Sequence, residues 1–333
     1  MVKSNPMPAL YARLSRAGLT RKYVRETALP GWWDDEVAST PAGYAQGLLL
    51  LSRHLGLDIR SLQNSSSPIR LREFGVCKYK KKEGVGEDEL AMCRMMATRA
   101  GQLAAEAMSA PHKGIPASAT EIRQTILDTG ACWVGLPELL DFCWSAGIPV
   151  LHLDHFPKNA RRPDGFVARV GGRPVVVLCI RKKQPAWLLF ILAHELGHAA
   201  LGHLPEDGSI MDDRVDEESR DAEEMEANAF AIELLTGSPT YRLRAADRWP
   251  NAQGLAEEAK RIGRGEMIDP GHVVLNYAHS MGPAFFGVAN AALARLNPDA
   301  NAVAFIRAVM ADRLDWSNLP EDSSEFLMRV TAG

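Results

Sequence analysis

The chain has 333 residues, of which 46% are hydrophobic and 24% are charged, and its net charge is −3 at neutral pH. This length exceeds the usual size of a single hydrophobic core, so two or three domains are expected. The apolar content excludes a wholly disordered chain. The longest unbroken apolar run, residues 186–193, is far shorter than the roughly 20 residues of a membrane span, so no membrane segment is expected.

The amino terminus and the cysteines predict a cytoplasmic protein. The first residues, Met-Val-Lys-Ser-Asn-Pro-Met-Pro, lack the apolar segment of a secretory signal. The five cysteines are scattered and form no C-x-x-C pair. That pattern is typical of reduced thiols rather than of disulfides or thiolate zinc sites.

The first predicted unit is a basic helical module at residues 1–66. Within it, residues 47–58 have the apolar spacing of a buried helix that ends at Gly56. Residues 1–85 carry 14 Lys and Arg against 7 Asp and Glu, so this part is +7 and the rest of the chain is −10. The asymmetry favours contact of residues 1–85 with DNA or an acidic partner. The alternative is a solvated charge bias without functional consequence.

A linker is predicted over residues 67–88. It follows the polar break at residues 64–68 and contains a second, more basic loop at residues 78–84. Helical periodicity then returns in three segments, at residues 88–108, 119–126 and 136–146.

Three short strands are predicted next. Residues 148–153 alternate like a strand, and residues 166–170 and 174–179 are apolar runs separated by Gly171 and Gly172. Two glycines between apolar runs favour a hairpin. We expect the second strand of this hairpin to accept an extended peptide by strand addition.

Pro185 opens a predicted helix that reaches about Leu201 and carries the H-E-x-x-H motif of residues 194–198. Because positions i and i+4 share a helix face, His194 and His198 can direct imidazole nitrogens at one metal ion. Glu195 is then placed to act as a general base toward a water molecule. The competing interpretation is a pair of helix histidines that flank a surface glutamate.

Residues 205–226 hold eleven Asp and Glu against two Arg and are predicted to form an acidic loop before a second helix at residues 226–235. A single acid in such a run is usually solvated. Catalytic zinc, however, usually has three protein ligands, so two histidines leave the site one ligand short.

Glu224 is the favoured third ligand. It lies three residues before Ala227 and seven before Ala231, so it shares their packed face and can reach the motif helix. Glu223 and Glu226, on adjacent faces, are the alternatives. Two imidazoles and one carboxylate suit zinc well.

The rest of the chain, residues 241–333, is predicted to be a helical region of sensory or regulatory type, with polar breaks at residues 263–271 and 297–301. The whole order of elements predicts an α+β protein that is mostly helical, with a short sheet packed on the H-E-x-x-H helix.

Two motifs together resemble the ImmA/IrrE metallopeptidase family. That family pairs H-E-L-G-H with a downstream E-x-E-A-N-x-F-A-x-x-L-L, and this chain has His-Glu-Leu-Gly-His at residues 194–198 and Glu-Met-Glu-Ala-Asn-Ala-Phe-Ala-Ile-Glu-Leu-Leu at residues 224–235. The resemblance covers about residues 90–240, including the hairpin before the motif helix. One departure is that Thr236 and Gly237 follow where the family often has Met-Pro.

The resemblance implies a zincin-like zinc metallopeptidase core at residues 89–240. It implies that His194, His198 and Glu224 bind the metal and that Glu195 is the base. By the same analogy the substrate is a transcriptional repressor, cleaved in a stress response or a mobile-element switch.

The amino-terminal segment resembles, more loosely, the Xre-type helix-turn-helix that often precedes this peptidase. Residues 48–62 fit its last helix, whereas residues 29–36 are acidic, contain Trp32 and Trp33, and are unlike an ordinary recognition helix. A helical module that binds protein is therefore an alternative to a DNA-binding one.

We thus predict a cytoplasmic, zinc-dependent peptidase that cleaves a repressor. The main alternative is a DNA-binding transcriptional regulator that uses the peptidase fold as a non-hydrolytic sensing or docking scaffold. A third is one half of a toxin–antitoxin-like pair that acts by binding alone. Spacing does not select a transition-state stabiliser among His272, Tyr277 and His279, and His203 is expected to be a helix-end residue off the ligand face.

Overall fold

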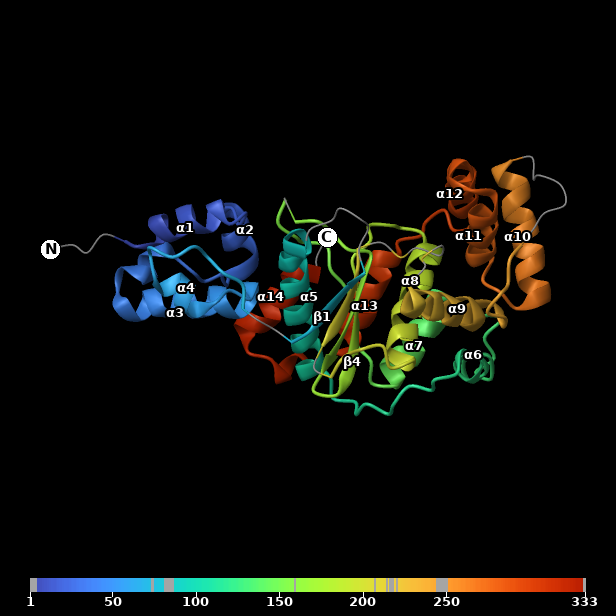
Figure 1. Cartoon of the computed structure of the whole chain (residues 1–333), viewed down its shortest axis with the longest axis horizontal. Helices are drawn as coiled ribbons and strands as arrows, with labels where there is room; N and C mark the ends of the chain where they lie inside the picture. The colour runs from blue at the N-terminus through green and yellow to red at the C-terminus, as the bar shows by residue number, and fades with distance from the viewer. Residues whose placement is uncertain are drawn as a thin grey trace.

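The computed structural model describes residues 5–72, 75–80, 87–158, 160–206, 208–213, 215, 219, 221–243 and 251–331. The molecule is elongated, with a helical module at the amino-terminal end, a small sheet flanked by helices in the middle, and a group of helices at the far end (Figure 1). Helices predominate, so the predicted α+β class is confirmed.

The amino-terminal module consists of short helices and turns: α1 (Met7–Arg16), α2 (Arg21–Tyr23), the π-helical turn η1 (Val24–Ala28), the 3-10 turn η2 (Asp35–Ser39), α3 (Pro41–Leu55) and α4 (Ile59–Gln63). Helix α3 ends at Gly56, whose φ of +62° belongs to the left-handed region that glycine tolerates, as the sequence predicts. Residues 29–34, where a recognition helix would be needed, form no α-helix.

The sheet has five strands: β1 (Cys77–Lys80), β2 (Val150–His152), β3 (Gly165–Val170), β4 (Arg173–Leu178) and β5 (Ser209–Asp212). Their order is β1-β5-β3-β4-β2. The predicted hairpin joins β3 and β4, which pair antiparallel. Gly171 and Gly172 have φ of +56° and +80°, the conformation that a type I′ turn requires at both central positions.

Three features of the sheet differ from the sequence predictions. Strand β1 lies within residues 67–88, where a linker is predicted, and β5 lies within the predicted acidic loop. Strand β4 is paired on both sides, with β3 and with β2, so it has no free edge and the predicted strand addition to it is wrong. Residues 81–84 of the predicted basic loop, and residues 207, 214, 216–218 and 220 of the acidic one, lie outside the described residues.

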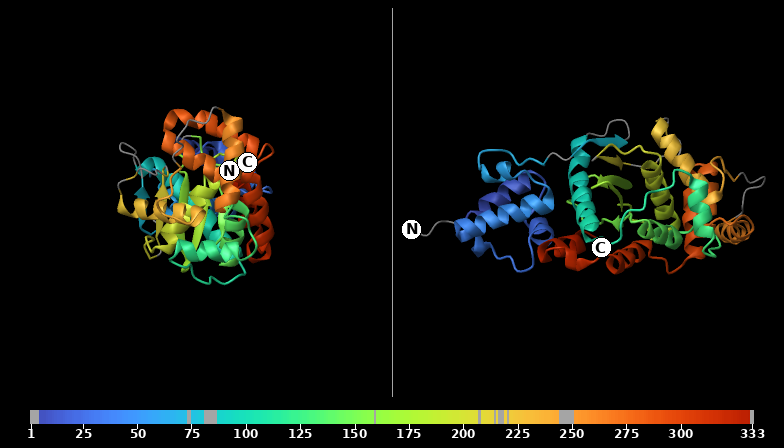
Figure 2. Two further views of the ribbon diagram at one scale, coloured as in Figure 1. Left: turned by 90° about the vertical axis from the view of Figure 1, so that its right-hand side faces the viewer. Right: turned by 90° about the horizontal axis from the view of Figure 1, so that it is seen from below.

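Five helices belong to the middle of the molecule: α5 (Glu87–Ala107), α6 (Ala119–Leu127), α7 (Leu136–Ser145), α8 (Pro185–Ala200) and α9 (Ala222–Thr236). Helices α5 and α8 both pack on β3 and β4, and the view from below shows the sheet between them (Figure 2). Helix α8 is therefore enclosed by the sheet and by α9, which packs along it. This explains why its apolar residues go all the way round the helix.

The predicted carboxy-terminal region divides into two parts. Helices α10 (Ala252–Glu266), α11 (Pro270–Met281) and α12 (Phe286–Leu296), with the turn η3 (Pro283–Phe285), form a hydrophobic cluster of their own. Helix α13 (Ala302–Arg313), the turn η4 (Trp316–Asn318) and helix α14 (Glu321–Thr331) return to the main core.

Helix α14 joins the amino-terminal module to the middle of the molecule. It packs on both α5 and η1. Arg329 donates a hydrogen bond to the Leu29 carbonyl, and Asp322 pairs with Arg53. One continuous apolar core consequently runs from the module into the sheet region. Within the described ranges, no helix combines the length and the apolarity that membrane crossing requires.

Candidate metal centre

Helix α8 buries the whole H-E-x-x-H motif. Pro185 occupies its first turn, where the missing amide hydrogen has no helical partner to lose. Because the sheet lies on one side of α8 and α9 on the other, His194, Glu195 and His198 are fully buried. A histidine pair flanking a surface glutamate, the competing interpretation, is therefore excluded.

Helix α9 presents Glu224 from its first turn. The Asp221 side chain caps this helix by accepting hydrogen bonds from the backbone amides of Glu223 and Glu224. A carboxylate in the first turn is also favoured by the helix dipole. Ala227 and Ala231 are fully buried, so Glu224 lies on the packed face of α9, as the sequence predicts.

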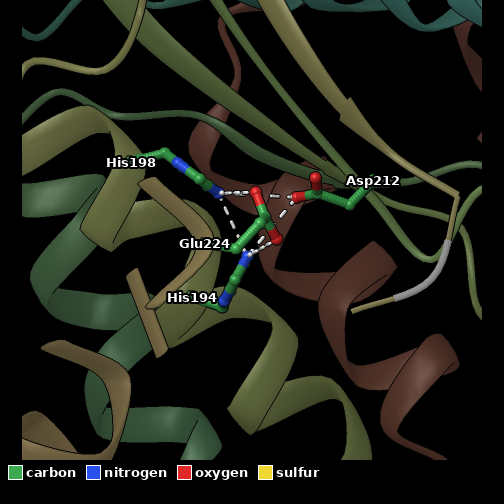
Figure 3. A group of neighbouring side chains, drawn as sticks. All are labelled: His194, His198, Asp212 and Glu224. Atoms are coloured by element: carbon green, nitrogen blue, oxygen red, sulfur yellow. Dashed lines mark hydrogen bonds and ion pairs between the residues drawn. The ribbon is translucent and has the colours of Figure 1, made fainter. Parts of the chain in front are cut away.

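Four side chains converge on one point: His194 and His198 from α8, Asp212 from the end of β5, and Glu224 from α9 (Figure 3). The two histidine Nε2 atoms are 3.1 Å apart, and the Glu224 carboxylate oxygens lie 3.4 Å and 3.3 Å from those of His194 and His198 respectively. One ligand atom from each of the four residues lies within 4.8 Å of all the others. We call these four residues the metal cluster.

The far nitrogens of both histidines are held by other side chains. His194 Nδ1 is 3.0 Å from Asn228 Oδ1, and His198 Nδ1 is 2.9 Å from His203 Nδ1. His203 Nε2 in turn lies 2.9 Å from Glu226. With His198 donating from Nδ1, His203 Nδ1 accepts this hydrogen bond, and His203 Nε2 donates a second one to Glu226. Both Nε2 atoms of the motif are then free to bind a cation.

His203 and Asn228 therefore have a role that sequence spacing did not reveal. His203 lies outside the metal cluster, as predicted, but it orients His198 instead of merely ending the helix. Asn228 belongs to the second family motif and orients His194.

The two alternative ligands point away from the cluster. Glu223 pairs with Lys78 and Lys80 of β1, at 2.5 Å and 3.0 Å. Glu226 accepts from His203 and is largely exposed. Among the three glutamates considered, only Glu224 reaches the histidines.

Asp212 is the member of the metal cluster that the sequence analysis missed. Its side chain is fully buried, and its Oδ2 lies 3.5 Å from His194 Nε2 and 3.8 Å from His198 Nε2. The available signal was the short run Ser-Ile-Met-Asp at residues 209–212, in which Ile210 and Asp212 share a strand face. Because acidic residues surround this short run, the sequence analysis assigned it to a loop.

Glu195 lies beside the cluster and is tightly packed. A Cβ atom on Gly165 would lie only 1.8 Å from Glu195 Oε1, so glycine at this place in β3 makes room for the carboxylate. Burial, with the charges of Asp212 and Glu224, raises the pKa of Glu195 well above its ordinary value. Gly165 is thus a second residue of the site that the sequence analysis did not identify.

The charges of the cluster fit a divalent cation. Both carboxylate oxygens of Glu195 and of Asp212 are buried without a hydrogen bond from a described residue. Burial lowers the pKa of His194, but the nearby Asp212 and Glu224 carboxylates outweigh it and raise that pKa to about 9. Burial raises the pKa of Glu224, but the two histidines outweigh it and lower that pKa below its ordinary value. A buried cation bound by two imidazoles and carboxylates would satisfy these groups, and that donor set suits zinc.

A cavity of about 680 Å³ lies between the first half of α8 and the helices α11 and α12. Asp213, next to Asp212, lines it, and so does Phe190, one turn before His194. His272 and His279, two of the three candidate stabilisers, also line this cavity. The third, Tyr277, lies against Phe285 in the α10–α12 cluster.

The departure from the family motif has a local explanation in this fold. Helix α9 ends at Gly237, whose φ is +89°, and Arg123 of α6 donates to the carbonyls of Leu234 and Leu235. The Thr236 hydroxyl donates to the Ile232 carbonyl. Thr236 and Gly237 thus close the helix without altering the face that carries Glu224.

Comparison with known proteins identifies one family. Residues 143–260 match the IrrE N-terminal-like domain, a span that contains α8, β5, α9 and every residue of the metal cluster. No curated protein and no solved structure matches the chain. The match makes no statement about the amino-terminal module, so its resemblance to a helix-turn-helix stays a prediction. Over residues 143–260, about a third of its length, this chain is similar to the IrrE N-terminal-like domain of a metallopeptidase family.

Proposed function

We propose that this protein is a zinc-dependent peptidase that cleaves a transcriptional repressor. The observation that carries the proposal is the buried convergence of His194, His198 and Glu224 beside Glu195, inside the span that matches a metallopeptidase family. His194, His198 and Glu224 would hold the ion. A zinc ion bound there would supply Lewis acidity to a scissile carbonyl and to an attacking water molecule.

Glu195 would move the proton. Its carboxyl group lies beside the cluster, where a bound cation would favour its ionised form, and it could then accept a proton from the attacking water. It would then deliver that proton to the leaving amine. Gly165 leaves the space that Glu195 occupies, and Asn228 and His203 keep the two imidazoles in one orientation.

The repressor as substrate rests on the resemblance to the ImmA/IrrE family. The amino-terminal module then serves to select the substrate, through protein contact or through the DNA on which a repressor sits. Docking of the module on α5 and α14 gives it a fixed place relative to the metal cluster.

The second candidate, a DNA-binding regulator without hydrolysis, is favoured by the +7 charge of residues 1–85. Some of these basic side chains form ion pairs or hydrogen bonds within the molecule. Lys78 and Lys80 pair with acids of α9, Arg21 pairs with Asp35, and Arg13 donates to four backbone carbonyls. We therefore rank the peptidase first.

The test is cleavage of repressors encoded beside this chain by the zinc-loaded protein, followed by mass spectrometry. Glu195→Gln should lower the rate by about 10²- to 10⁴-fold, because the base is lost while the ligands remain. Glu223→Gln, which removes an equal charge outside the cluster, should cleave like the unmodified protein.

Zinc content measured on the same samples keeps the result interpretable. Equal zinc with lost cleavage in Glu195→Gln supports the assignment, and undiminished cleavage by this variant contradicts it. A protein that cleaves none of these repressors but binds DNA with a steep salt dependence is the regulator instead.

A further inference from the structure

Asp212 lies on the side of the metal cluster that His194, His198 and Glu224 do not cover. His194, His198 and Glu224 form one face of the cluster, with donor separations of 3.1 Å, 3.4 Å and 3.3 Å. The Asp212 carboxylate stands over this face, 3.5 Å and 3.8 Å from the two Nε2 atoms (Figure 3).

These separations match a tetrahedron around zinc. Zinc–nitrogen and zinc–oxygen bonds of about 2.0–2.2 Å at tetrahedral angles place neighbouring donor atoms about 3.3–3.6 Å apart. The distance between the two Nε2 atoms, and the distances from each of them to one Glu224 oxygen and to Asp212 Oδ2, run from 3.1 Å to 3.8 Å and bracket that value. Asp212 is therefore placed where a fourth protein ligand would lie, a position that catalytic zinc sites normally leave to water.

A role for Asp212 as an orienting partner of a histidine does not fit. A carboxylate that orients a metal-binding imidazole contacts the nitrogen that faces away from the metal. Here those nitrogens are already held, His194 Nδ1 by Asn228 and His198 Nδ1 by His203. Asp212 instead faces the Nε2 atoms and lies against the Glu195 carboxyl group.

The backbone of Asp212 is fixed on both sides. Its carbonyl accepts from the Asp164 amide, and its register partners are Gly165 in β3 and Lys80 in β1. The next residue, Asp213, donates its amide to the Lys80 carbonyl and pairs with Arg161 through its side chain. Movement of the Asp212 carboxylate thus requires rotation of its side chain, while the strand stays in place.

We propose that Asp212 is a fourth protein ligand that closes the zinc site at rest. Water and substrate gain the fourth coordination position only when the Asp212 side chain rotates away. The protein is then a latent peptidase, and the proposal rests on the peptidase function put forward above.

The first test needs no substrate. Cobalt(II)-loaded protein is titrated with acetohydroxamate, a small anion that binds an open coordination position, and the visible absorption of cobalt is followed. If the closed form makes up 90–99% of the molecules, Asp212→Asn should bind acetohydroxamate about 10- to 100-fold more tightly than the unmodified protein. Zinc affinity, measured by competition with a chelator, should fall by about 10- to 100-fold in the same variant.

Glu223→Gln is the matched control, because it removes an equal charge from a residue that adjoins Glu224 in the sequence but pairs with Lys78 and Lys80 instead. It should leave acetohydroxamate binding unchanged. Asp212→Ala repeats the test with a side chain that has no donor oxygen. Equal acetohydroxamate affinity in the unmodified protein and both Asp212 variants overturns the proposal.

Repressor cleavage by the same samples separates this proposal from the peptidase function. Under latency, Asp212→Asn cleaves faster than the unmodified protein. If Asp212→Asn opens the cobalt site but no sample cleaves, Asp212 is a ligand and the peptidase function fails. If the unmodified protein cleaves and binds acetohydroxamate as tightly as Asp212→Asn, the function stands and the latency fails.

Discussion

Two pairs of adjacent acids each have one member in the buried metal cluster and one member paired with basic side chains around that cluster. In the pair Asp212 and Asp213, the first faces the motif histidines and the second pairs with Arg161. In the pair Glu223 and Glu224, the second faces the histidines and the first pairs with Lys78 and Lys80. We call Lys78, Lys80 and Arg161 the basic rim.

Backbone geometry makes this division. Neighbouring residues of a strand point to opposite faces, and neighbouring residues of a helix lie about 100° apart. Two acids that are neighbours in the sequence thus have different roles, one in the metal cluster and the other in an ion pair. The acids of the cluster need a cation from solution, whereas those of the rim are neutralised by the chain itself. Each prediction below tests this contrast, starting with the largest effect.

Removal of zinc should destabilise the protein more than any single change in the rim. A ligand that binds only the folded state stabilises it by about 4 kcal/mol when its free concentration is about 1,000 times Kd. Chemical denaturation with added zinc and with a chelator measures this difference. Identical curves under both conditions would show that the cluster holds no zinc.

Glu224→Gln and Glu223→Gln should differ clearly in their zinc affinity. The first removes a cluster ligand and should weaken zinc binding by about 100-fold or more, since even partners of the ligands are worth 10- to 100-fold. The second removes an acid of the rim and should change zinc affinity by less than about 3-fold, as a screened surface charge would. Comparable losses in both variants would contradict the assignment of Glu224.

Asp213→Asn should cost about 1–2 kcal/mol of unfolding free energy. It breaks the two-pronged contact with Arg161, in which the Asp213 carboxylate is almost fully buried and the Arg161 side chain is 40% exposed. The exposed guanidinium can be solvated after the change, so the loss stays below that of a fully buried pair. Thermal and chemical unfolding of the zinc-free protein measure it, and Arg161→Met should give a larger loss because it leaves the buried Asp213 carboxylate without this partner.

Lys80→Met should have the smallest effect and a defined pH dependence. Burial raises the pKa of Glu223, but Lys78 and Lys80 outweigh it and lower that pKa; Lys80 also lowers the pKa of Asp221. Because these folded-state pKa values are depressed, the stabilisation is present above the ordinary carboxyl pKa and is lost as the pH falls through the folded-state values.

The variant should therefore lose about 1 kcal/mol or less at pH 7, and less at pH 3 than at pH 7. Denaturation of the zinc-free protein at both pH values, at low and at high salt, measures the change. A loss that is the same at pH 3 as at pH 7 would show that packing of the lysine stem, and not its charge, is what matters.

Most helices and the hairpin were predictable because their signals are local. Apolar spacing placed α5–α8 to within a residue or so and located α3 and α9 with starts that were six and four residues late, and paired glycines placed the β3–β4 turn. Strands β1 and β5 were missed because both are four-residue segments in strongly charged surroundings, and both are strands through pairing with distant segments, β1 with β5 and β5 with β1 and β3. The free edge assigned to β4 failed for a related reason, since strand order is a property of the assembled sheet.

The sequence by itself determined the elements on which the predicted chemistry depends: H-E-x-x-H on a helix, an acid at the right place on a second helix, and motifs that resemble one family. These features depend on helical periodicity, which acts within a few residues. Only the tertiary structure decided that Asp212 joins the cluster, that Gly165 makes room for Glu195, and that His203 orients His198. Asp212 and Gly165 reach the motif helix through strand pairing and sheet–helix packing, and such long-range contacts leave no fixed spacing in the chain.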